Sequence, residues 1–155
     1  HLFRYAKEHE RYAAGRDRIT VEWKGWRICP LVCYDLRFTV FSRNRFDVER
    51  KGGLDYDLLL YVANWPSARA HAWNLLLRAR AVENLCFVAG LNRVGTDGNG
   101  LHYSGESAVI DFQGRPLSEC ADAEVVVTTT LPARELLAHR EHFPAMFDAD
   151  AFELR

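Results

Sequence analysis

A cysteine at the end of an apolar segment is the residue of this sequence best placed to do chemistry. Cys33 closes the apolar run 26–33 and is followed by the polar residues Tyr34, Asp35 and Arg37. A strand that turns sharply into a helix presents such a side chain at the sheet edge, where the backbone N–H of Tyr34 could stabilise an oxyanion. A cysteine in an apolar strand is also commonly a small buried hydrophobic residue. The pattern alone leaves both interpretations of Cys33 open.

A second polar cluster follows the next apolar run. Asn64 and Trp65 come directly after that run, at the place where ligands collect in α/β sheets. Arg69 or Arg37 could bind a substrate carboxylate through paired hydrogen bonds. The alternatives are a solvated helix position for Arg69, an ion pair with Asp35 for Arg37 and simple packing for Trp65. The cluster therefore predicts a binding site without deciding which arginine is the anchor.

The elements that must position these groups can be read from hydrophobic spacing and turn residues. Apolar residues recur at helical spacing over 67–84 with no Gly or Pro inside, which predicts a long helix. Short apolar or alternating runs bounded by turn residues predict strands at 18–23, 26–33, 56–63, 85–92, 107–112 and 124–131, with a last helix over 133–141. Hairpins mixed with strand-helix-strand units predict a mixed sheet in a layered α/β domain.

Composition excludes several classes of protein. The chain has 155 residues, 48% of them hydrophobic, and a formal net charge of −1, which predicts one globular domain and gives no electrostatic case for nucleic acid. No apolar run reaches the roughly 18–20 residues that cross a membrane. The four cysteines form no CxxC pair, so we expect reduced thiols and a cytoplasmic location. His139 and His142 lack the spacing of a zinc helix, so neither a metal nor an organic cofactor is expected.

Several ordered motifs carry a resemblance to a known family. They are Ile28-Cys-Pro-Leu-Val-Cys-Tyr-Asp-Leu-Arg-Phe38, His1-Leu-Phe3 before it, and Ala63-Asn-Trp-Pro66, Ala79-Arg-Ala-Val-Glu-Asn84 and Gly90-Leu-Asn-Arg-Val-Gly95 after it. Together they resemble the nitrilase (carbon-nitrogen hydrolase) superfamily, and within it the bacterial omega-amidase branch. The resemblance extends over essentially the whole chain. It departs from the family at Thr39, where the family usually has Pro, and at residues 46–54, which look inserted.

The resemblance implies a Glu-Lys-Cys triad in which Cys33 is the nucleophile. The family's lysine would lie two residues before His1 and its glutamate earlier still, so neither is present in this sequence. Glu8 matches a supporting glutamate that orients the lysine and the attacking water. The implied fold is a four-layer αββα sandwich, with residues 1–155 as a carbon-nitrogen hydrolase domain that lacks its N-terminal part. We expect the chain alone to be inactive.

The expected reaction is hydrolysis of the terminal amide of a 2-oxo dicarboxylic acid monoamide, such as 2-oxoglutaramate or 2-oxosuccinamate, to the acid and ammonia. The partners that this implies are the small amide, water and a second copy of the chain, since members of the superfamily pair through their α layers. Two alternatives remain. One is an inactive scaffold or interaction subunit, and the other is a nitrilase or carbamoyl amidase of the same superfamily.

Overall fold

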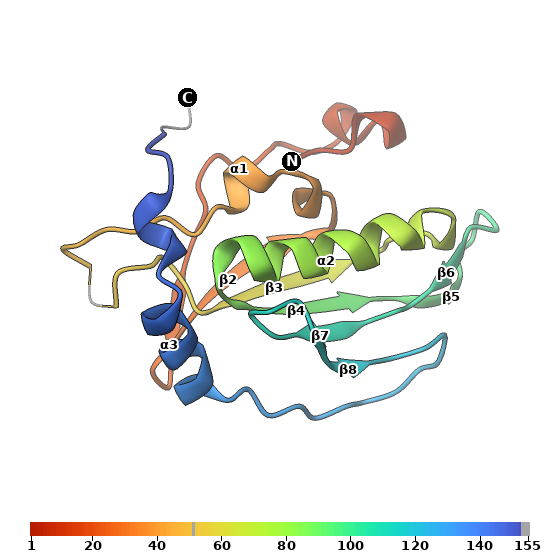
Figure 1. Ribbon diagram of the computed structural model, residues 1–155. Helices are drawn as coiled ribbons and strands as arrows, with labels where there is room; N and C mark the ends of the chain where they lie inside the picture. Colours follow the sequence, from red (N-terminus) through yellow and green to blue (C-terminus); the bar gives the residue numbers. More distant parts are fainter. Residues whose placement is uncertain (51, 153–155) are drawn as a thin grey trace.

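A six-stranded mixed sheet organises the chain (Figure 1). The computed structural model describes residues 1–50 and 52–152. The strands follow the order β1-β2-β3-β4-β7-β8. Strands β2, β3 and β4 are mutually parallel, and the remaining neighbours are antiparallel. Their bounds are β1 Val21–Trp23, β2 Trp26–Val32, β3 Leu58–Ala63, β4 Phe87–Asn92, β7 Ala108–Ile110 and β8 Pro116–Glu119.

One long helix covers one face of this sheet. Helix α2 (Ala70–Asn84) lies along the sheet in Figure 1 and packs its buried face, Trp73, Leu77 and Ala81, into the main core. A Cβ at Gly90 of β4 would lie 2.7 Å from Leu77 Cδ1 and 2.8 Å from Trp73 Cζ2, so only glycine lets the helix approach this strand so closely. The helix therefore packs directly against the backbone of β4.

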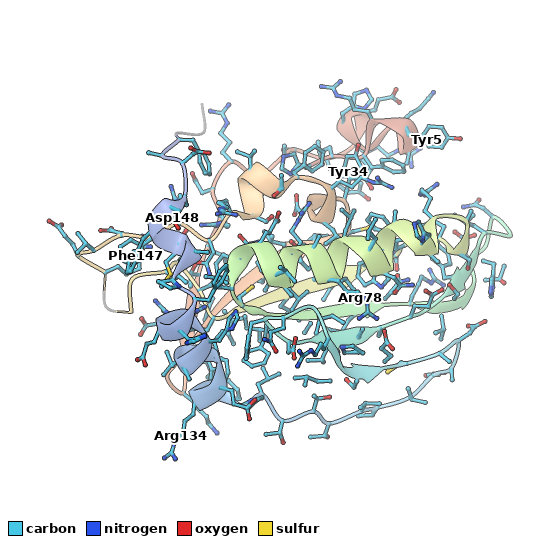
Figure 2. All side chains as sticks on the ribbon, in the orientation of Figure 1. Tyr5, Tyr34, Arg78, Arg134, Phe147 and Asp148 are labelled. Atoms are coloured by element: carbon cyan, nitrogen blue, oxygen red, sulfur yellow. The ribbon has the colours of Figure 1, made fainter. Side chains whose placement is uncertain are left out.

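Short elements surround this core. They are the 3₁₀ turns η1 (Arg4–Ala6), η2 (Glu8–Glu10), η3 (Cys33–Arg37), η4 (Ser67–Arg69) and η5 (Ala145–Asp148), the helices α1 (Thr39–Ser42) and α3 (Ala133–His142), and a separate hairpin of β5 (Val94–Thr96) and β6 (His102–Ser104). Figure 2 shows the side chains of Tyr5 and Arg134 projecting away from the body of the chain.

Helix α3 is held to the sheet by a buried cation. Arg140 is 4% exposed, and its Nη1 lies 2.6 Å from Asp57 Oδ1. Its Nε and Nη2 donate to the carbonyl oxygens of Leu85 (2.9 Å) and Tyr56 (3.0 Å). Burial alone would raise the pKa of Asp57, but the hydrogen bonds and charges of Arg27 and Arg140 outweigh it and lower that pKa. One carboxylate thus ties the start of β3 to α3.

The opposite side of the parallel strands exposes a row of apolar side chains near the strand ends. Val32, Val62 and Leu91 are paired across β2, β3 and β4 and are 61%, 48% and 51% exposed. Their chain neighbours Leu31 and Tyr61 point into the core. Helix α3 covers the other end of this face, where Leu136 packs with Phe87 and Leu58 at the starts of β4 and β3, whereas no described helix covers the apolar row itself.

The mixed α/β sheet, the hairpin at its start and both helices predicted from the sequence are confirmed. The strand predicted at 124–131 is wrong, because β7 pairs instead with Pro116–Glu119 and residues 124–131 form no strand. The run 124–131 is longer and richer in β-branched residues, which is typical of a strand. The tight turn at Asp111–Arg115 instead places the less apolar segment Pro116–Glu119 directly beside β7. The predicted surface loop at 46–54 closes through a Phe46–Leu54 bridge, and its residue 51 lies outside the described residues.

Candidate active site

Cys33 stands at a strained turn between a strand and a 3₁₀ helix. It follows β2 directly, opens η3 and has a φ of +41°, a left-handed conformation that is costly for any residue with a Cβ. The side chain of Asp35 accepts the N–H of Val32 at 3.0 Å, which closes the turn around Cys33. The turn places the thiol at the end of the sheet and leaves it partly exposed, unlike an ordinary core cysteine.

Two further residues hold this turn from outside. The His1 ring Nδ1 lies 2.8 Å from Asp35 Oδ1, and the same ring stacks on Phe38 at 3.7 Å between ring centroids. From α2, the buried Arg80 donates its Nη2 to the carbonyl oxygen of Leu36 at 2.7 Å. Side chains from two separate segments, His1 and Arg80, therefore support the turn.

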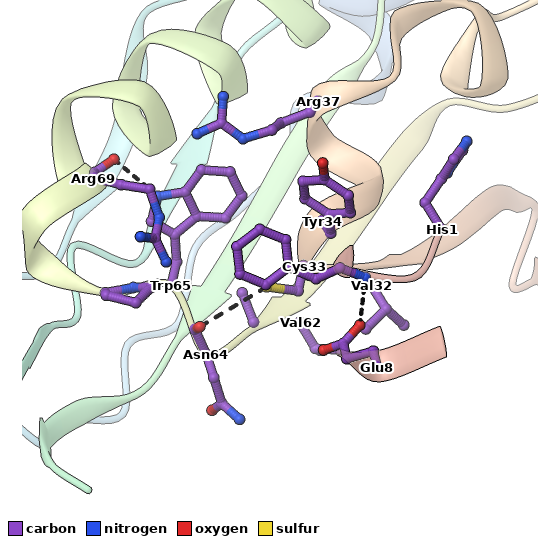
Figure 3. A pocket seen from close by; sticks show the side chains of 13 residues that line it. His1, Glu8, Val32, Cys33, Tyr34, Arg37, Val62, Asn64, Trp65 and Arg69 are labelled. Atoms are coloured by element: carbon purple, nitrogen blue, oxygen red, sulfur yellow. Dashed lines mark hydrogen bonds between the residues drawn. The ribbon is translucent and has the colours of Figure 1, made fainter. Parts of the chain in front are cut away.

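A cavity of about 700 Å³ opens in front of the thiol (Figure 3). The structure brings all seven of the site residues predicted from sequence to its wall: Glu8, Cys33, Tyr34, Arg37, Asn64, Trp65 and Arg69. They come from η2, from η3 and from the segment that follows β3. His1 and Phe3 also line it. Residues far apart in the sequence thus converge on one concave surface of the size that small-molecule sites have.

The surroundings of Cys33 keep the thiol protonated. Burial raises the pKa of Cys33 above its ordinary value, and the carboxylates of Glu8 and Asp35 act in the same direction, while Arg69 opposes them. Its Sγ lies 3.9 Å from the carbonyl oxygen of Asn64 (dashed in Figure 3). Because the thiolate is the nucleophilic form, this thiol needs a proton acceptor in order to react.

Glu8 is the carboxylate on the cavity wall. Its Oε2 accepts the N–H of Phe3 at 2.7 Å, which fixes the side chain in place, while Oε1 has no partner among the described residues. The backbone N–H of Tyr34 lies in the first turn of η3, where a helix offers it no acceptor of its own. The cavity wall therefore holds a carboxylate acceptor near the thiol, and the Tyr34 N–H beside the thiol is a donor without a helical acceptor.

Two guanidinium groups stand on aromatic rings of the same wall. Arg37 lies over the Trp65 ring at 5.0 Å and Arg69 over the Phe3 ring at 5.6 Å. Neither forms an ion pair with any described residue, so the predicted alternative of an Arg37–Asp35 pair is wrong. Trp65 is 4% exposed and packs on Trp73 while its ring carries Arg37, so it serves both the core and the wall.

The other cysteines differ from Cys33. Cys29 and Cys86 are completely buried in the core, and burial raises the pKa of Cys29 to about 11 and that of Cys86 further. Cys120 lies just beyond β8, on the far side of the sheet order from β2. All four thiols are free.

Two residues that support the site were not predicted from the sequence. Asp35 closes the turn and Asn92 bonds the backbone of Trp65. Both lie inside the motifs that carry the family resemblance, so their position was visible but their partners, 3 and 27 residues away, were not. Among the described residues, no group of three or more His, Cys, Asp and Glu side chains could hold a metal ion, and no helix is long and apolar enough to cross a membrane.

Comparison with known proteins defines the class of this fold and site. The carbon-nitrogen hydrolase family matches residues 1–138, and the chain belongs to that family. It is 54% identical over 156 aligned residues to the omega-amidase YafV of Escherichia coli K12, covering 99% of this chain and 57% of the relative. It is 35% identical to a 2-oxoglutaramate amidase of Bacillus subtilis, covering 96% of this chain and 54% of that protein. The chain thus spans a little over half the length of these relatives.

Solved structures agree with the family. A carbon-nitrogen hydrolase superfamily protein from Xanthomonas campestris, with an arsenic adduct in its active site, is 69% identical, with a TM-score of 0.97 over 100% of this chain and 58% of the other. An amidase from Nesterenkonia, with acrylamide added to its active-site cysteine, is 27% identical, with a TM-score of 0.69 over 90% of this chain and 53% of the other. The α/β fold of nitrilase type expected from the sequence is confirmed.

Proposed function

We propose that this chain carries the nucleophile and one substrate-binding wall of a thiol-dependent amidase that acts on small amides bearing a carboxylate. The observation that carries the proposal is the placement of Cys33, in a strained turn, on a cavity that also holds two guanidinium groups with no ion-pair partner among the described residues. The omega-amidase and 2-oxoglutaramate amidase relatives support the same chemistry.

The chemistry follows from the groups on the wall. The Cys33 thiolate attacks the amide carbonyl carbon, a C–S bond forms, and the carbonyl oxygen becomes an oxyanion that the Tyr34 N–H stabilises. The C–N bond then breaks, and ammonia leaves with a proton from the enzyme. Water hydrolyses the resulting thioester to the free acid and restores the thiol. Glu8, with one oxygen fixed on Phe3 and one open to the cavity, orients the water.

Catalysis also needs groups that the described wall does not contain. The cavity lining has no lysine and only one carboxylate, Glu8, whereas the resemblance implies a lysine at the oxyanion and a second glutamate as proton shuttle. We place both in the part of the relatives' length that this chain does not cover. The raised pKa of Cys33 lowers its thiolate fraction, and without these two groups we expect residues 1–155 alone to be inactive.

The carboxylate preference comes from Arg37 and Arg69. A guanidinium that forms no ion pair and lies against an aromatic ring keeps its hydrogen-bond donors free for a planar anion. Such a charge-assisted contact contributes roughly 1.5–3 kcal/mol, which corresponds to about one to two decades in affinity. A 2-oxo dicarboxylic acid monoamide carries a carboxylate a few bonds from its scissile carbonyl, and Cys33 and both arginines line one cavity.

The test compares substrates in the natural protein. We expect much faster ammonia release from 2-oxoglutaramate or 2-oxosuccinamate than from a neutral amide of similar length. Replacing the arginine that binds the carboxylate, by Arg37→Met or Arg69→Met, should raise the KM for the charged amide by about tenfold or more and leave the KM for the neutral amide unchanged. Arg134→Met, on the exposed side of α3, is the matched control and should change neither KM.

The outcomes separate the alternatives. Equal rates on charged and neutral amides, or hydrolysis confined to nitriles or carbamoyl compounds, would assign the protein to another branch of the superfamily. A folded natural protein that hydrolyses none of them would be a scaffold or interaction subunit instead.

We also propose that the natural protein is a cytoplasmic homodimer that pairs through its α layer. The outer face of α2 exposes Leu75 and Val82, seven residues apart and 57% and 50% exposed, which suits a helix that meets a second copy. Sedimentation of the natural protein should show a dimer at micromolar concentration, and Leu75→Lys should shift it toward monomer.

A further inference from the structure

The backbone of Trp65, in one wall of the cavity, is held by the amide side chain of Asn92. After the last ladder pair of β3 and β4, Ala63 with Asn92, the chain leaves the sheet and continues as Asn64, Trp65 and Pro66, all of which line the cavity. A segment that leaves a sheet loses the ladder bonds that fixed its backbone. Something else must hold these residues in place.

The side chain of Asn92 replaces the missing ladder. Its Oδ1 accepts the N–H of Trp65 at 2.7 Å, and its Nδ2 donates to the carbonyl oxygen of Trp65 at 2.9 Å. The amide thus bonds both polar groups of one residue, as a neighbouring strand would. A second bond from Nδ2 reaches the carbonyl oxygen of Gly105 at 2.8 Å, which ties the same amide to the turn before β7.

Asn92 is itself fixed at its backbone. Ser107 Oγ accepts the N–H of Asn92 at 2.9 Å and donates to its carbonyl oxygen at 3.2 Å. The backbone of Asn92 is therefore fixed on both its polar groups, while its amide bonds Trp65 on one side and Gly105 on the other.

The held residues are those that face the substrate. The Trp65 ring carries the Arg37 guanidinium at 5.0 Å, and the carbonyl oxygen of the preceding residue, Asn64, lies 3.9 Å from Cys33 Sγ. A shift of the Trp65 backbone would displace the ring on which the Arg37 guanidinium lies, while the backbone that carries the thiol would stay in place. The turn that carries Cys33 has its own supports in Asp35 and Arg80, which Asn92 does not touch.

We infer that Asn92 is a positioning residue of this site: its amide fixes the Asn64–Pro66 wall and thereby the affinity for the substrate, without contacting the substrate. The inference rests on the proposed amidase function for its kinetic readout. We therefore expect loss of the Asn92 amide to change KM more than kcat, because the wall binds the substrate while the turn that carries Cys33 is held by a separate set of contacts.

The test is Asn92→Asp in the natural protein. The carboxylate keeps the size and the acceptor oxygen but loses both donors, and it sets negative charge against the carbonyl oxygens of Trp65 and Gly105. We expect the KM for 2-oxoglutaramate to rise about tenfold or more, with kcat changed less than about threefold and the iodoacetamide reaction of Cys33 unchanged. Asn99→Asp makes the same change in the exposed turn after β5 and should alter none of these.

A second measurement separates this inference from the proposed function. Calorimetry of the product 2-oxoglutarate gives affinity without turnover, and we expect about tenfold weaker binding by Asn92→Asp than by wild type. If wild type neither hydrolyses the amide nor binds the product, the proposed function fails. If wild type does both and a folded Asn92→Asp or Asn92→Ala variant matches it in KM and product affinity, the inference is overturned. Failure of both variants to fold also overturns it, since the role assigned to Asn92 is local.

Discussion

The strain at Cys33 has a measurable effect on stability that reverses the usual order of alanine and glycine. With φ at +41°, any residue with a Cβ at position 33 is in the left-handed region, which costs roughly 1–2 kcal/mol, whereas glycine adopts it freely. Glycine also loses about 0.5–1 kcal/mol through the greater freedom of the unfolded chain. The difference predicts that Cys33→Gly is more stable than Cys33→Ala by about 0.5–1 kcal/mol. Both variants lack the thiol, so the comparison isolates the backbone.

The assay is urea denaturation of the two variants in the natural protein, with the pair Ala79 and Ala79→Gly as the matched control. Residue 79 lies inside α2, where glycine should be less stable than alanine by about 1 kcal/mol. The expected result is therefore opposite signs at the two positions. Lower stability for Cys33→Gly than for Cys33→Ala would show that the turn at Cys33 is not held in a strained conformation.

Three further predictions concern the supports of the fold and the thiols. Arg140→Met should lower the free energy of unfolding by about 3–5 kcal/mol in urea denaturation, because it leaves Asp57 and two buried carbonyl oxygens short of a donor. Arg134→Met should change it by less than about 0.5 kcal/mol, and equal losses in the two variants would refute the role of Arg140 in holding α3 to the sheet. The pKa of Asp57 is lowered in the folded protein, so its contribution to stability is present above the unfolded value of 3.8 and is lost as the pH falls through the folded value. Asp57→Asn should therefore make the free energy of unfolding fall less steeply at acid pH, and an unchanged pH dependence would contradict this role of Asp57. Brief iodoacetamide treatment of the natural protein followed by peptide mapping should label Cys33 ahead of the buried Cys29 and the others, whereas preferential labelling elsewhere with Cys33 untouched would refute the nucleophile.

Local pattern was sufficient for much of the fold. The helix over 70–84 has an uninterrupted apolar stripe, and the strands at 26–32 and 58–63 are apolar runs bounded by turn residues, so both element type and order could be predicted. The strand at 116–119 could not, because it is short, polar and begins with Pro116, and only its pairing with β7 makes it a strand. Pairing across the sheet is a tertiary property that no single segment encodes.

The site was predictable in its residue types but not in its supports. Cys33 ends a strand, and Asn64, Trp65 and Arg69 follow the neighbouring parallel strand, so their convergence follows from the sheet alone. A site role for Glu8 could be predicted only from the family resemblance, since a glutamate in a polar segment is otherwise an ordinary solvated residue. The contact of Asn92 with Trp65 spans 27 residues and depends on where β3 leaves the sheet, which spacing does not reveal.

Ammonia release from 2-oxoglutaramate by the natural protein and by its Cys33→Ala variant tests the central claim most directly. We expect steady ammonia release by the wild type and none above background by Cys33→Ala, while a Cys29→Ala variant keeps the wild-type rate. Wild-type turnover by Cys33→Ala would contradict it.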